Sequence, residues 1–536
     1  MAEFGVLNWT IVIVVFTVFL AMGYFISRKV STAEDFYKGH SAIPWWVIGV
    51  SVVAAYVSAM TFLGAPAWAY KAGMSVIIIH INYPIVIFVV VTFFFPFFYN
   101  SGVISIYDYL EKRFGSASRL TISGVFLVTQ ALSSAAVLYG TSLVISFITG
   151  ISVIPCIFIV TLIALTYTIM GGIAAIIWIE LVQAVIFVSG AGIIMYTLLT
   201  KLPLPLAETI AELKTMGKIN PLKWGLDFSD ATSLWAGVVA MTLYHITVCG
   251  TNQMMVQRTL TARSIGDAKK SFLIIGFAGF FIYFLFVSLG TLFYHYYDGK
   301  QFENDNMIIL QFAANYGLPG LMGIVAAAIM SASMSSLASA YNSLSTVTLV
   351  DFYQKFVSTP QTPAYNLRLS RIFTASWGLF IIIPAIMYST LANNSILELL
   401  TKIGSFFVAA KLSMFGLGFF SKHTTQKGLL VGVVAGLLTV WVVAITTSIS
   451  WPWYCLIGTI VNVGVAIPLS ILWTGRQPEW SEYSIPGQKR MFKERGLPEK
   501  QEGWYLVPGK VDPQLYYLLA FFGLTLAFLI GLQTWL

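Results

Sequence analysis

Charged residues and cysteines are scarce in this chain of 536 residues. Asp, Glu, Lys and Arg together make up 10% of it, whereas 58% is hydrophobic, and the mean hydropathy is +0.82. This composition excludes an ordinary soluble domain and is typical of an integral membrane protein. Cys156, Cys249 and Cys455 have neither disulfide nor zinc-site spacing, so we expect them to pack within apolar helices.

Motifs for nucleotide binding and covalent catalysis are missing as well. The chain has no glycine-rich phosphate loop, no soluble segment long enough for an ATPase domain, and no nucleophile with an acid–base pair at a usable spacing. We therefore expect no enzyme, no catalytic residues and no ATP-driven pump. Any transport would depend on an ion gradient.

Apolar runs of about 20 residues, the length that crosses a bilayer, divide the chain. They predict fourteen transmembrane helices, near residues 7–27, 47–70, 76–98, 121–149, 153–170, 176–199, 233–255, 270–295, 315–349, 372–392, 394–420, 428–448, 452–474 and 515–536. The first run is followed by Arg28 and Lys29 and has no small-residue cleavage site, so we interpret it as an uncleaved span.

The positions of lysine and arginine predict the orientation. With the N-terminus outside, the internal loops hold 22 of the 30 Lys and Arg residues, which follows the positive-inside rule. The net charge of +8 then reflects topology and anionic lipid rather than nucleic acid. We expect a multi-pass protein of the cell membrane, surrounded by lipid bilayer, with both termini extracytoplasmic, no nucleic-acid partner and monomeric function.

A ladder of serines runs through the predicted span near 315–349. Ser331, Ser335, Ser339 and Ser343 are four residues apart, and Ser336 lies about 100° round the helix from Ser335, which makes one polar face. Hydrocarbon offers hydroxyls no partners, so this face must meet other helices, water or a bound ion. Close helix packing through small residues also explains the ladder by itself.

Two predicted spans contain residues that interrupt helices. In the second span, Gly64 and Pro66 predict either unwinding near mid-membrane or a simple proline kink. In the seventh, residues 249–253 are polar and include Gly250. Unwound carbonyls at this depth must line a cavity or bind a cation. Two such breaks, five spans apart, suggest an inverted repeat of spans 2–6 and 7–11.

Few ionisable side chains remain within the spans. Glu180 is either an ion- or proton-coupling carboxylate or a structural partner of a helix end. His80 and His245 are either packing residues or ligand contacts. Lys411 is about ten residues from either end of its span, which would strain a side chain reaching for the interface.

Five motifs, in order along the chain, resemble those of the sodium:solute symporter family, which includes sodium-coupled glucose, sialate, proline and monocarboxylate transporters. They are residues 51–59, residues 111–114, Gly171-Gly172 with Trp178 and Gln183, residues 257–264, and residues 335–339 with Asp351. The resemblance covers nearly the whole chain. It implies an all-α integral membrane protein with a leucine-transporter-like 5+5 inverted repeat, about 14 transmembrane helices, and sodium-coupled symport by alternating access.

This fold implies seven regions. The five-helix repeats would span 47–199 and 233–420. The other regions would be an N-terminus with the first helix and a cytoplasmic loop, an extracellular loop, two additional helices, a cytoplasmic segment and the last helix, at 1–46, 200–232, 421–474, 475–514 and 515–536.

The resemblance also implies a Na⁺ site between the broken second span and the serine ladder. The family's ligands correspond to the carbonyl oxygens of Ala54, Val57 and Ala332 and the hydroxyls of Ser335 and Ser336. Neutral oxygens suit Na⁺, a hard cation that must be released again. A second sodium, bound by some members, would use Glu180 and Ser339. Here a glutamate replaces the family's aspartate and Ala338 replaces a serine, which favours one sodium per solute.

The same resemblance places a small-molecule solute beside this site. The expected contacts are Tyr56, Ser58, Thr61, His80, Tyr83, His245 and Lys411. Gly279 stands where some sugar transporters carry a lysine, and Ser133 where sialate transporters carry an arginine. Histidines with a lysine favour a sugar acid, keto acid or monocarboxylate, with neutral sugar as the next interpretation. A proton-coupled or ion-independent carrier, with Glu180 and the histidines as a relay, is the alternative.

Overall fold

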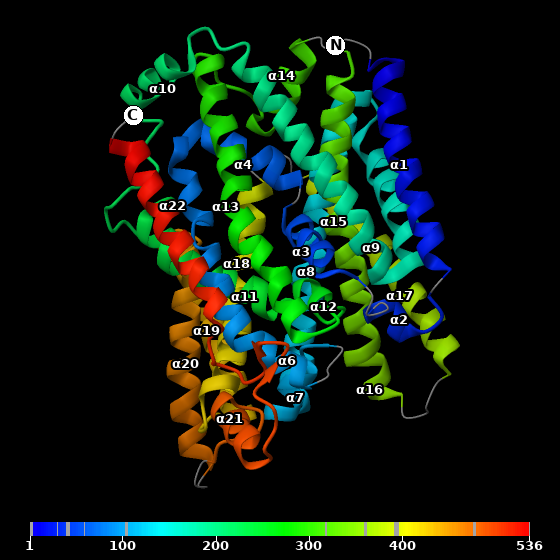
Figure 1. Cartoon of the computed structure of the whole chain (residues 1–536), viewed down its shortest axis with the longest axis vertical. Coiled ribbons are helices and arrows are strands. Elements are labelled where there is room, and N and C mark those ends of the chain that lie inside the picture. Colours follow the sequence, from blue (N-terminus) through cyan, green and yellow to red (C-terminus); the bar gives the residue numbers. More distant parts are fainter. Residues whose placement is uncertain are drawn as a thin grey trace.

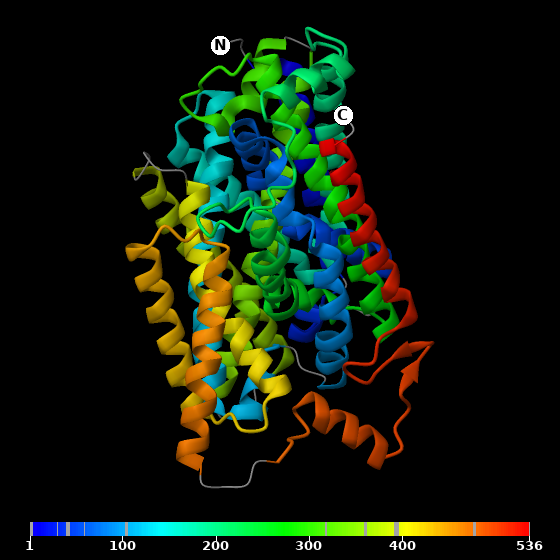
Figure 2. The same ribbon diagram turned by 90° about the vertical axis from the view of Figure 1, so that its left-hand side faces the viewer.

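Helices form nearly all of the molecule, an elongated bundle (Figures 1 and 2). The computed structural model describes residues 4–28, 30–38, 43–57, 59–101, 105–316, 319–357, 362–390, 396–474 and 479–534. Within them, ten helical segments are long and apolar enough to cross a membrane: Gly5–Ser27, Met60–Ser101, Ser116–Thr149, Val153–Leu199, Ile265–Tyr296, Leu321–Phe356, Pro363–Thr390, Gln426–Thr446, Pro452–Trp473 and Pro513–Thr534. The exact count of fourteen spans and the inverted repeat stay predictions.

The helices of the N-terminal half alternate between long spans and short pieces. In chain order they are α1 (Gly5–Ser27), α2 (Ala33–Lys38), α3 (Trp45–Tyr56), α4 (Ala59–Ala72), the 3₁₀ helix η1 (Gly73–His80), α5 (Tyr83–Val89), the π-helix η2 (Val90–Phe94), α6 (Phe95–Ser101), α7 (Asp108–Phe114), α8 (Ser116–Thr149), α9 (Val153–Leu199) and α10 (Leu206–Thr215).

The C-terminal half also alternates between long helices and short ones. Its elements are the π-helix η3 (Ala236–Ala240), α11 (Met241–Thr251), α12 (Gln253–Thr259), α13 (Ile265–Tyr296), η4 (Asp305–Met307), α14 (Ile308–Tyr316), α15 (Leu321–Val347), the π-helix η5 (Thr348–Tyr353), α16 (Gln354–Phe356), α17 (Pro363–Thr390), α18 (Ile396–Phe420), α19 (Gln426–Thr446), α20 (Trp453–Thr474), α21 (Ile485–Glu494), η6 (Pro513–Leu515) and α22 (Tyr516–Thr534). A two-stranded antiparallel ribbon joins β1 (Lys500–Gln501) to β2 (Trp504–Tyr505).

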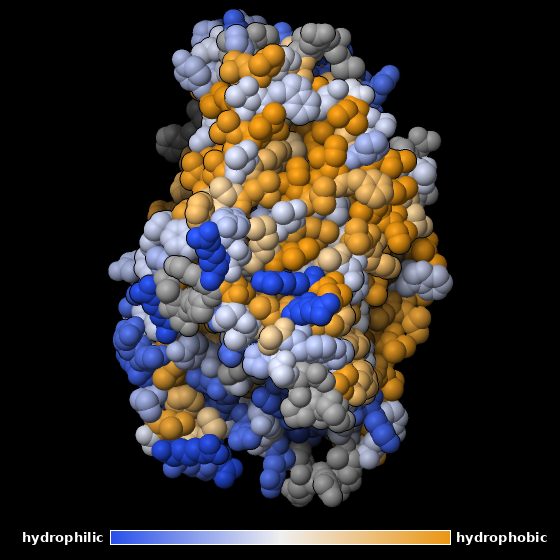
Figure 3. Space-filling model, turned by 90° about the vertical axis from the view of Figure 1, so that its right-hand side faces the viewer, coloured by the Kyte–Doolittle hydropathy of each residue, from blue (hydrophilic) through white to orange (hydrophobic). Residues whose placement is uncertain are grey.

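The outer surface is that of a multi-pass membrane protein. Large apolar side chains are exposed along the peripheral helices, among them Leu162, Leu438, Leu472 and Leu524. Figure 3 shows hydrophobic side chains in a broad band and hydrophilic ones gathered toward the lower end. A soluble protein would bury so much apolar surface, whereas lipid tails solvate it.

The two ends of the bundle carry different short elements. α1 begins and α22 ends at the upper end, where α10 and α14 also lie, whereas α7, α16 and α21 lie at the lower end (Figures 1 and 2). The segments predicted as extracellular (200–232) and cytoplasmic (475–514) are therefore at opposite ends. Which end faces the cytoplasm stays a prediction.

The serine ladder lies on the central helix of the bundle. α15 packs against α9, α8, α17 and α3. From Val325 to Val347 every residue is buried except Ser336. Small residues allow this close approach: a Cβ at Gly190 of α9 would lie 2.8 Å from the Cβ of Ala328.

The first helix break is not where the sequence predicted it. Pro66 lies inside α4, and α3 ends at Tyr56, after which Val57 has an extended backbone (φ −86°, ψ 107°). α13 supports the helix at Pro66 because Gly290 lets the backbones meet: a Cβ there would lie 2.2 Å from the Pro66 carbonyl oxygen. The predicted interruption of the second span is present, but it lies at Val57 and not at Gly64–Pro66, where the helix continues.

Two other breaks coincide with polar or glycine-rich segments. α11 and α12 are separated at Asn252 (φ −98°, ψ 121°), whose side chain accepts a hydrogen bond from the Met254 N–H at 2.9 Å. This break lies within the predicted segment 249–253. α9 is interrupted at Gly172 (φ 56°, ψ −152°), between the predicted spans 153–170 and 176–199. A side chain there would be strained, and its Cβ would lie 2.5 Å from the Phe36 carbonyl oxygen.

The segment between α20 and α22 is fastened to the lower end of the bundle by a buried ion pair. Lys269 of α13 lies 2.6 Å from Asp512, and neither side chain is exposed. Asp512 also accepts from the Tyr505 N–H at 2.8 Å, and Lys269 donates to the Tyr505 carbonyl at 2.8 Å. Because a buried charge needs a partner, the Lys269 ammonium and the Asp512 carboxylate stabilise each other, and together they hold the Tyr505 backbone in place.

Asp512→Ala is expected to destabilise the protein by about 3–5 kcal/mol, because it leaves the Lys269 ammonium buried without its anion. Glu499→Ala removes the exposed Glu499–Lys510 pair, whose charged atoms are 2.5 Å apart, and serves as the control with an expected cost below about 1 kcal/mol. Thermal unfolding in detergent, followed by tryptophan fluorescence, measures both. Equal shifts in Tm would contradict the structural role of the buried pair.

Candidate ion and solute site

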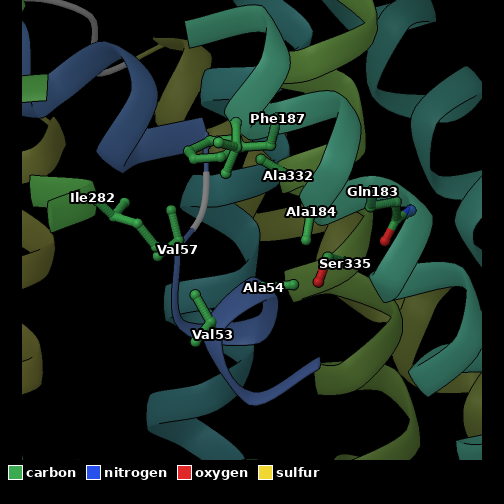
Figure 4. A pocket seen from close by; sticks show the side chains of 10 residues that line it. Val53, Ala54, Val57, Gln183, Ala184, Phe187, Ile282, Ala332 and Ser335 are labelled. Carbon is green, nitrogen blue, oxygen red and sulfur yellow. The ribbon is translucent and has the colours of Figure 1, made fainter. Parts of the chain in front are cut away.

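Four of the five residues predicted to bind the first sodium line one cavity (Figure 4). Ala54 and Val57 come from the broken end of α3, and Ala332 and Ser335 come from α15 across the cavity. Val57 leaves the helical conformation, so the last carbonyls of α3 lie at the broken end of the helix beside this cavity. The residues that line the cavity, Ser335 among them, are all uncharged.

Ser336 is the fifth predicted ligand and bridges the two helices. Its hydroxyl oxygen lies 3.4 Å from the Ala55 carbonyl oxygen of α3 and 3.4 Å from the Ala332 carbonyl oxygen of its own helix. Both hydrogen bonds are long, and the residue keeps some exposure within an otherwise buried stretch. A hydroxyl held loosely between two carbonyls has lone pairs available for a cation.

Glu180 forms a buried ion pair with Arg258. The Arg258 Nη2 lies 2.7 Å from Glu180 Oε1, and the two side chains are 0% and 1% exposed. Oε1 also accepts from the hydroxyls of Ser335 at 3.0 Å and Ser339 at 2.6 Å, and Oε2 accepts from the Ser51 hydroxyl. Every partner is a donor, so both oxygens act as acceptors, as those of an ionised carboxylate do.

The guanidinium of Arg258 contacts both residues that were predicted to bind a second sodium, Glu180 and Ser339. It donates to Ser339 as well as to Glu180, and its Nε donates to Ser51 at 3.0 Å. The two residues expected to bind that sodium are thus joined by a fixed cation from α12. Sequence reasoning missed this pairing, although Arg258 lies in the motif at 257–264. The two partners are 78 residues apart, so no local pattern reveals their contact.

Most residues predicted to contact the solute form one group of rings, the aromatic cluster: Tyr56, His80, Tyr83, His245 and Tyr283. Tyr83 stacks on His245 with ring centroids 4.9 Å apart, and Tyr56 meets both edge-on at 5.6 and 5.9 Å. His80 stacks on Tyr283 at 3.3 Å, and its Nδ1 lies 3.1 Å from the Tyr83 hydroxyl. Four of the five were predicted from the sequence.

Of the other residues predicted to contact the solute, Thr61 lies at the aromatic cluster and Lys411 lies elsewhere. The Thr61 hydroxyl joins the aromatic cluster, 3.3 Å from that of Tyr283. Lys411 does not: its ammonium lies 5.4 Å from the ring centroid of Phe126, and no hydrogen bond or ion pair between described residues links it to the cluster. A contact of Lys411 with the solute stays a prediction. Ser58 lies outside the described residues.

Two members of this site were not predicted. Tyr283 is one helical turn beyond Gly279 on α13, so the change noted at Gly279 pointed to the correct face. A Cβ at Gly279 would lie 2.7 Å from Tyr83 Cδ2, so the glycine makes room for that ring. Asn82 lies between η1 and α5, and its Oδ1 is 2.8 Å from the Nδ1 of His245.

Comparison with known proteins agrees with this arrangement. The family model of the sodium:solute symporter family matches residues 36–436. The chain therefore belongs to that family, and sodium is its coupling ion. Its relatives are transporters, and no catalytic family is indicated.

Individual relatives match over most of their lengths. The sodium/sialic acid symporter SiaT of Proteus mirabilis is 26% identical over 469 residues, 85% of this chain and 93% of that protein. The sodium/glucose cotransporter of Vibrio parahaemolyticus is 28% identical over 459 residues, 79% of this chain and 83% of that protein. A solved outward-open structure of a Na⁺-coupled sialic acid symporter has the same fold, with a TM-score of 0.82, 24% identity, and coverage of 89% of this chain and all of that chain.

Proposed function

We propose that this protein imports a small polar organic solute, a sugar, sugar acid or carboxylate, together with Na⁺ across the cell membrane by alternating access. The observation that carries the proposal is the convergence of the broken end of α3 with Ala332 and Ser335 of α15 around one cavity (Figure 4). Na⁺ would bind the carbonyls of Ala54, Val57 and Ala332 and the hydroxyls of Ser335 and Ser336. The protein would work as a monomer in the bilayer, with both termini extracytoplasmic.

Coupling follows from the position of this site between two helices. A cation bound to both α3 and α15 holds them together and orders the aromatic cluster, because Tyr56 is the last residue of α3. Separation of α15 from the α3 carbonyls would remove ligands from both sides of the ion and release it. Sodium must then favour the solute-competent state, and the solute must raise sodium affinity by the same factor.

The pairing of Glu180 with Arg258 supports one sodium per solute. A second Na⁺ at Glu180 and Ser339 would have to displace a guanidinium that already makes charge-assisted bonds there. The same pairing disfavours the proton-relay alternative, since the Glu180 oxygens already accept hydrogen bonds from Ser51, Ser335, Ser339 and Arg258. A relay carboxylate needs an oxygen that is free to take up a proton.

A thermal-shift screen tests the proposal. Sugars, uronates and monocarboxylates are added to the purified protein in sodium and in choline at one pH and ionic strength. Any ligand of the coupled site is expected to raise Tm in sodium and much less in choline, because binding to the native state stabilises it. A solute that raises Tm equally in both salts would indicate an ion-independent carrier.

A further inference from the structure

Nearly all of the charge buried in the described part of the molecule is paired. Seven formally charged side chains are buried there, and six of them form the ion pairs Arg119–Asp351 at 2.6 Å, Glu180–Arg258 at 2.7 Å and Lys269–Asp512 at 2.6 Å. The seventh is Lys411 of α18, which is 7% exposed. The three pairs are each neutral, so Lys411 is left as one positive charge without a counterion.

The ammonium of Lys411 faces an aromatic ring instead of an anion. Its Nζ lies 5.4 Å from the ring centroid of Phe126 on α8, and Lys411 forms no ion pair or hydrogen bond with any described residue. The Phe126 ring in turn contacts Tyr107, with ring centroids 5.6 Å apart. A cation–π contact recovers only a small part of the hydration that a buried ammonium loses. The ring alone therefore does not stabilise the charge.

Lipid headgroups do not supply the missing anion either. Lys411 lies nine residues before the end of α18 at Phe420, which is about 13 Å of helix rise. In addition, α18 packs against α8, α11, α19 and α20, and these contacts leave Lys411 within the protein. A phosphate at the membrane surface is too far away for a lysine side chain to reach by snorkelling.

Gln130 offers a second donor next to Lys411. It lies four residues after Phe126 on α8, so the two side chains share one face of that helix. Its Nε2 has two N–H donors, and their acceptors are distant: the Ser134 hydroxyl at 3.4 Å and the Met254 sulfur at 3.8 Å. An amide with donors so weakly used can donate to an additional ligand.

We propose that a small monovalent anion, such as chloride, binds between α18 and α8, held by the Lys411 ammonium and the Gln130 amide. One negative charge balances the one unpaired cation, so the buried charge sums to zero. By contacting both helices, the anion would hold α18 against α8, as a buried ion pair does elsewhere in the bundle. This site goes beyond the proposed function, because it requires neither sodium nor any particular cargo.

A chloride titration of the full-length protein in detergent tests the proposal. Chloride replaces gluconate at constant sodium and pH, without solute, so no acidic group of the cargo can act as the anion. Tm of the wild type is expected to rise with chloride, because an anion that binds only the native state stabilises it. A wild type whose Tm is the same in chloride and in gluconate would overturn the proposal.

Variants assign the chloride response to this site. Lys411→Met should lose the response, and in gluconate it should be at least as stable as wild type, because it buries no unpaired charge. Lys411→Arg should keep the response. Gln130→Leu should need about three- to tenfold more chloride for the same gain in Tm, the effect of one lost hydrogen bond.

Lys493→Met is the matched control, since it removes one exposed lysine from α21. It should respond to chloride as wild type does, which separates the buried site from general effects of salt and net charge. A Lys411→Met protein with the wild-type response to chloride would overturn the proposal.

Bromide locates the anion directly. Crystals grown with bromide in place of chloride are expected to show an anomalous difference peak within hydrogen-bonding distance of the Lys411 Nζ. Bromide peaks only at other positions would contradict the site. A peak at Lys411 in a protein whose Tm ignores chloride would indicate an adventitious ion only, and would overturn the proposal as well.

A sodium titration separates this inference from the proposed function. Sodium replaces choline at constant chloride, and the expected gain in Tm reports the sodium site alone. A wild type that responds to sodium but not to chloride would refute the anion site and leave sodium-coupled symport standing. A wild type that responds to chloride but not to sodium would refute the sodium site and leave the anion site standing.

Discussion

Ser336→Ala is expected to abolish sodium-stimulated uptake in proteoliposomes. The substitution removes one of the five neutral oxygens of the proposed sodium site. It also removes the only hydroxyl that reaches from α15 to the Ala55 carbonyl in the described structure. Losing even an outer-shell partner of a metal ligand costs about ten- to hundredfold in affinity, so losing a ligand should raise the sodium concentration for half-maximal uptake by at least that much. Uptake of the proposed solute against a sodium series measures it.

Ser343→Ala is the matched control. Ser343 lies on the same face of α15 and is more deeply buried than Ser336, and its hydroxyl donates to the Ser339 carbonyl of its own helix at 2.8 Å. Its loss should leave sodium dependence unchanged. If Ser336→Ala retains the wild-type sodium dependence, Ser336 is not a sodium ligand.

Arg258→Met is expected to cost about 3–5 kcal/mol of stability, because it leaves the Glu180 carboxylate buried without its cation. The hydroxyls of Ser51, Ser335 and Ser339 would still surround that carboxylate. The position left by the Arg258 guanidinium should therefore become a cation site. Tm of this variant should therefore depend on sodium more steeply than that of wild type. Thermal unfolding in a sodium–choline series at constant ionic strength measures both effects.

The double variant Glu180→Gln/Arg258→Met provides the control. It removes both charges, so most of the lost stability should return and the additional sodium dependence should disappear. A double variant no more stable than Arg258→Met would show that Arg258 acts through packing rather than through its charge.

Local chemistry explains what could be predicted from the sequence. Serines four residues apart share a helix face wherever the helix packs, so the ladder indicated a polar surface on α15 before its partners were known. The polar segment at 249–253 marked the break observed at Asn252. His80 and His245 were expected to be packing residues or ligand contacts on helices that border one cavity, and their rings stack on each other in the aromatic cluster.

Long-range packing explains what could not be predicted. Pro66 lies inside a continuous helix, and Gly290 of α13, more than 200 residues away in the chain, packs closely against it. Arg258 reaches Glu180 because α12 packs against α15 and α3. No local sequence pattern predicts this helix packing or the ion pair that it allows. Lys411 was named as a solute contact through the family resemblance, and the direction of its side chain, which contacts Phe126, has no signal in the sequence.

Solute accumulation driven by a sodium gradient tests the central claim most directly. Proteoliposomes receive an inward gradient of Na⁺ or of choline, with equal pH inside and outside and a protonophore present to collapse any proton gradient. The proposed sodium site between α3 and α15 predicts that labelled solute accumulates above its external concentration only with sodium. Equal accumulation with choline, or accumulation with sodium only when the protonophore is left out, would contradict sodium-coupled symport.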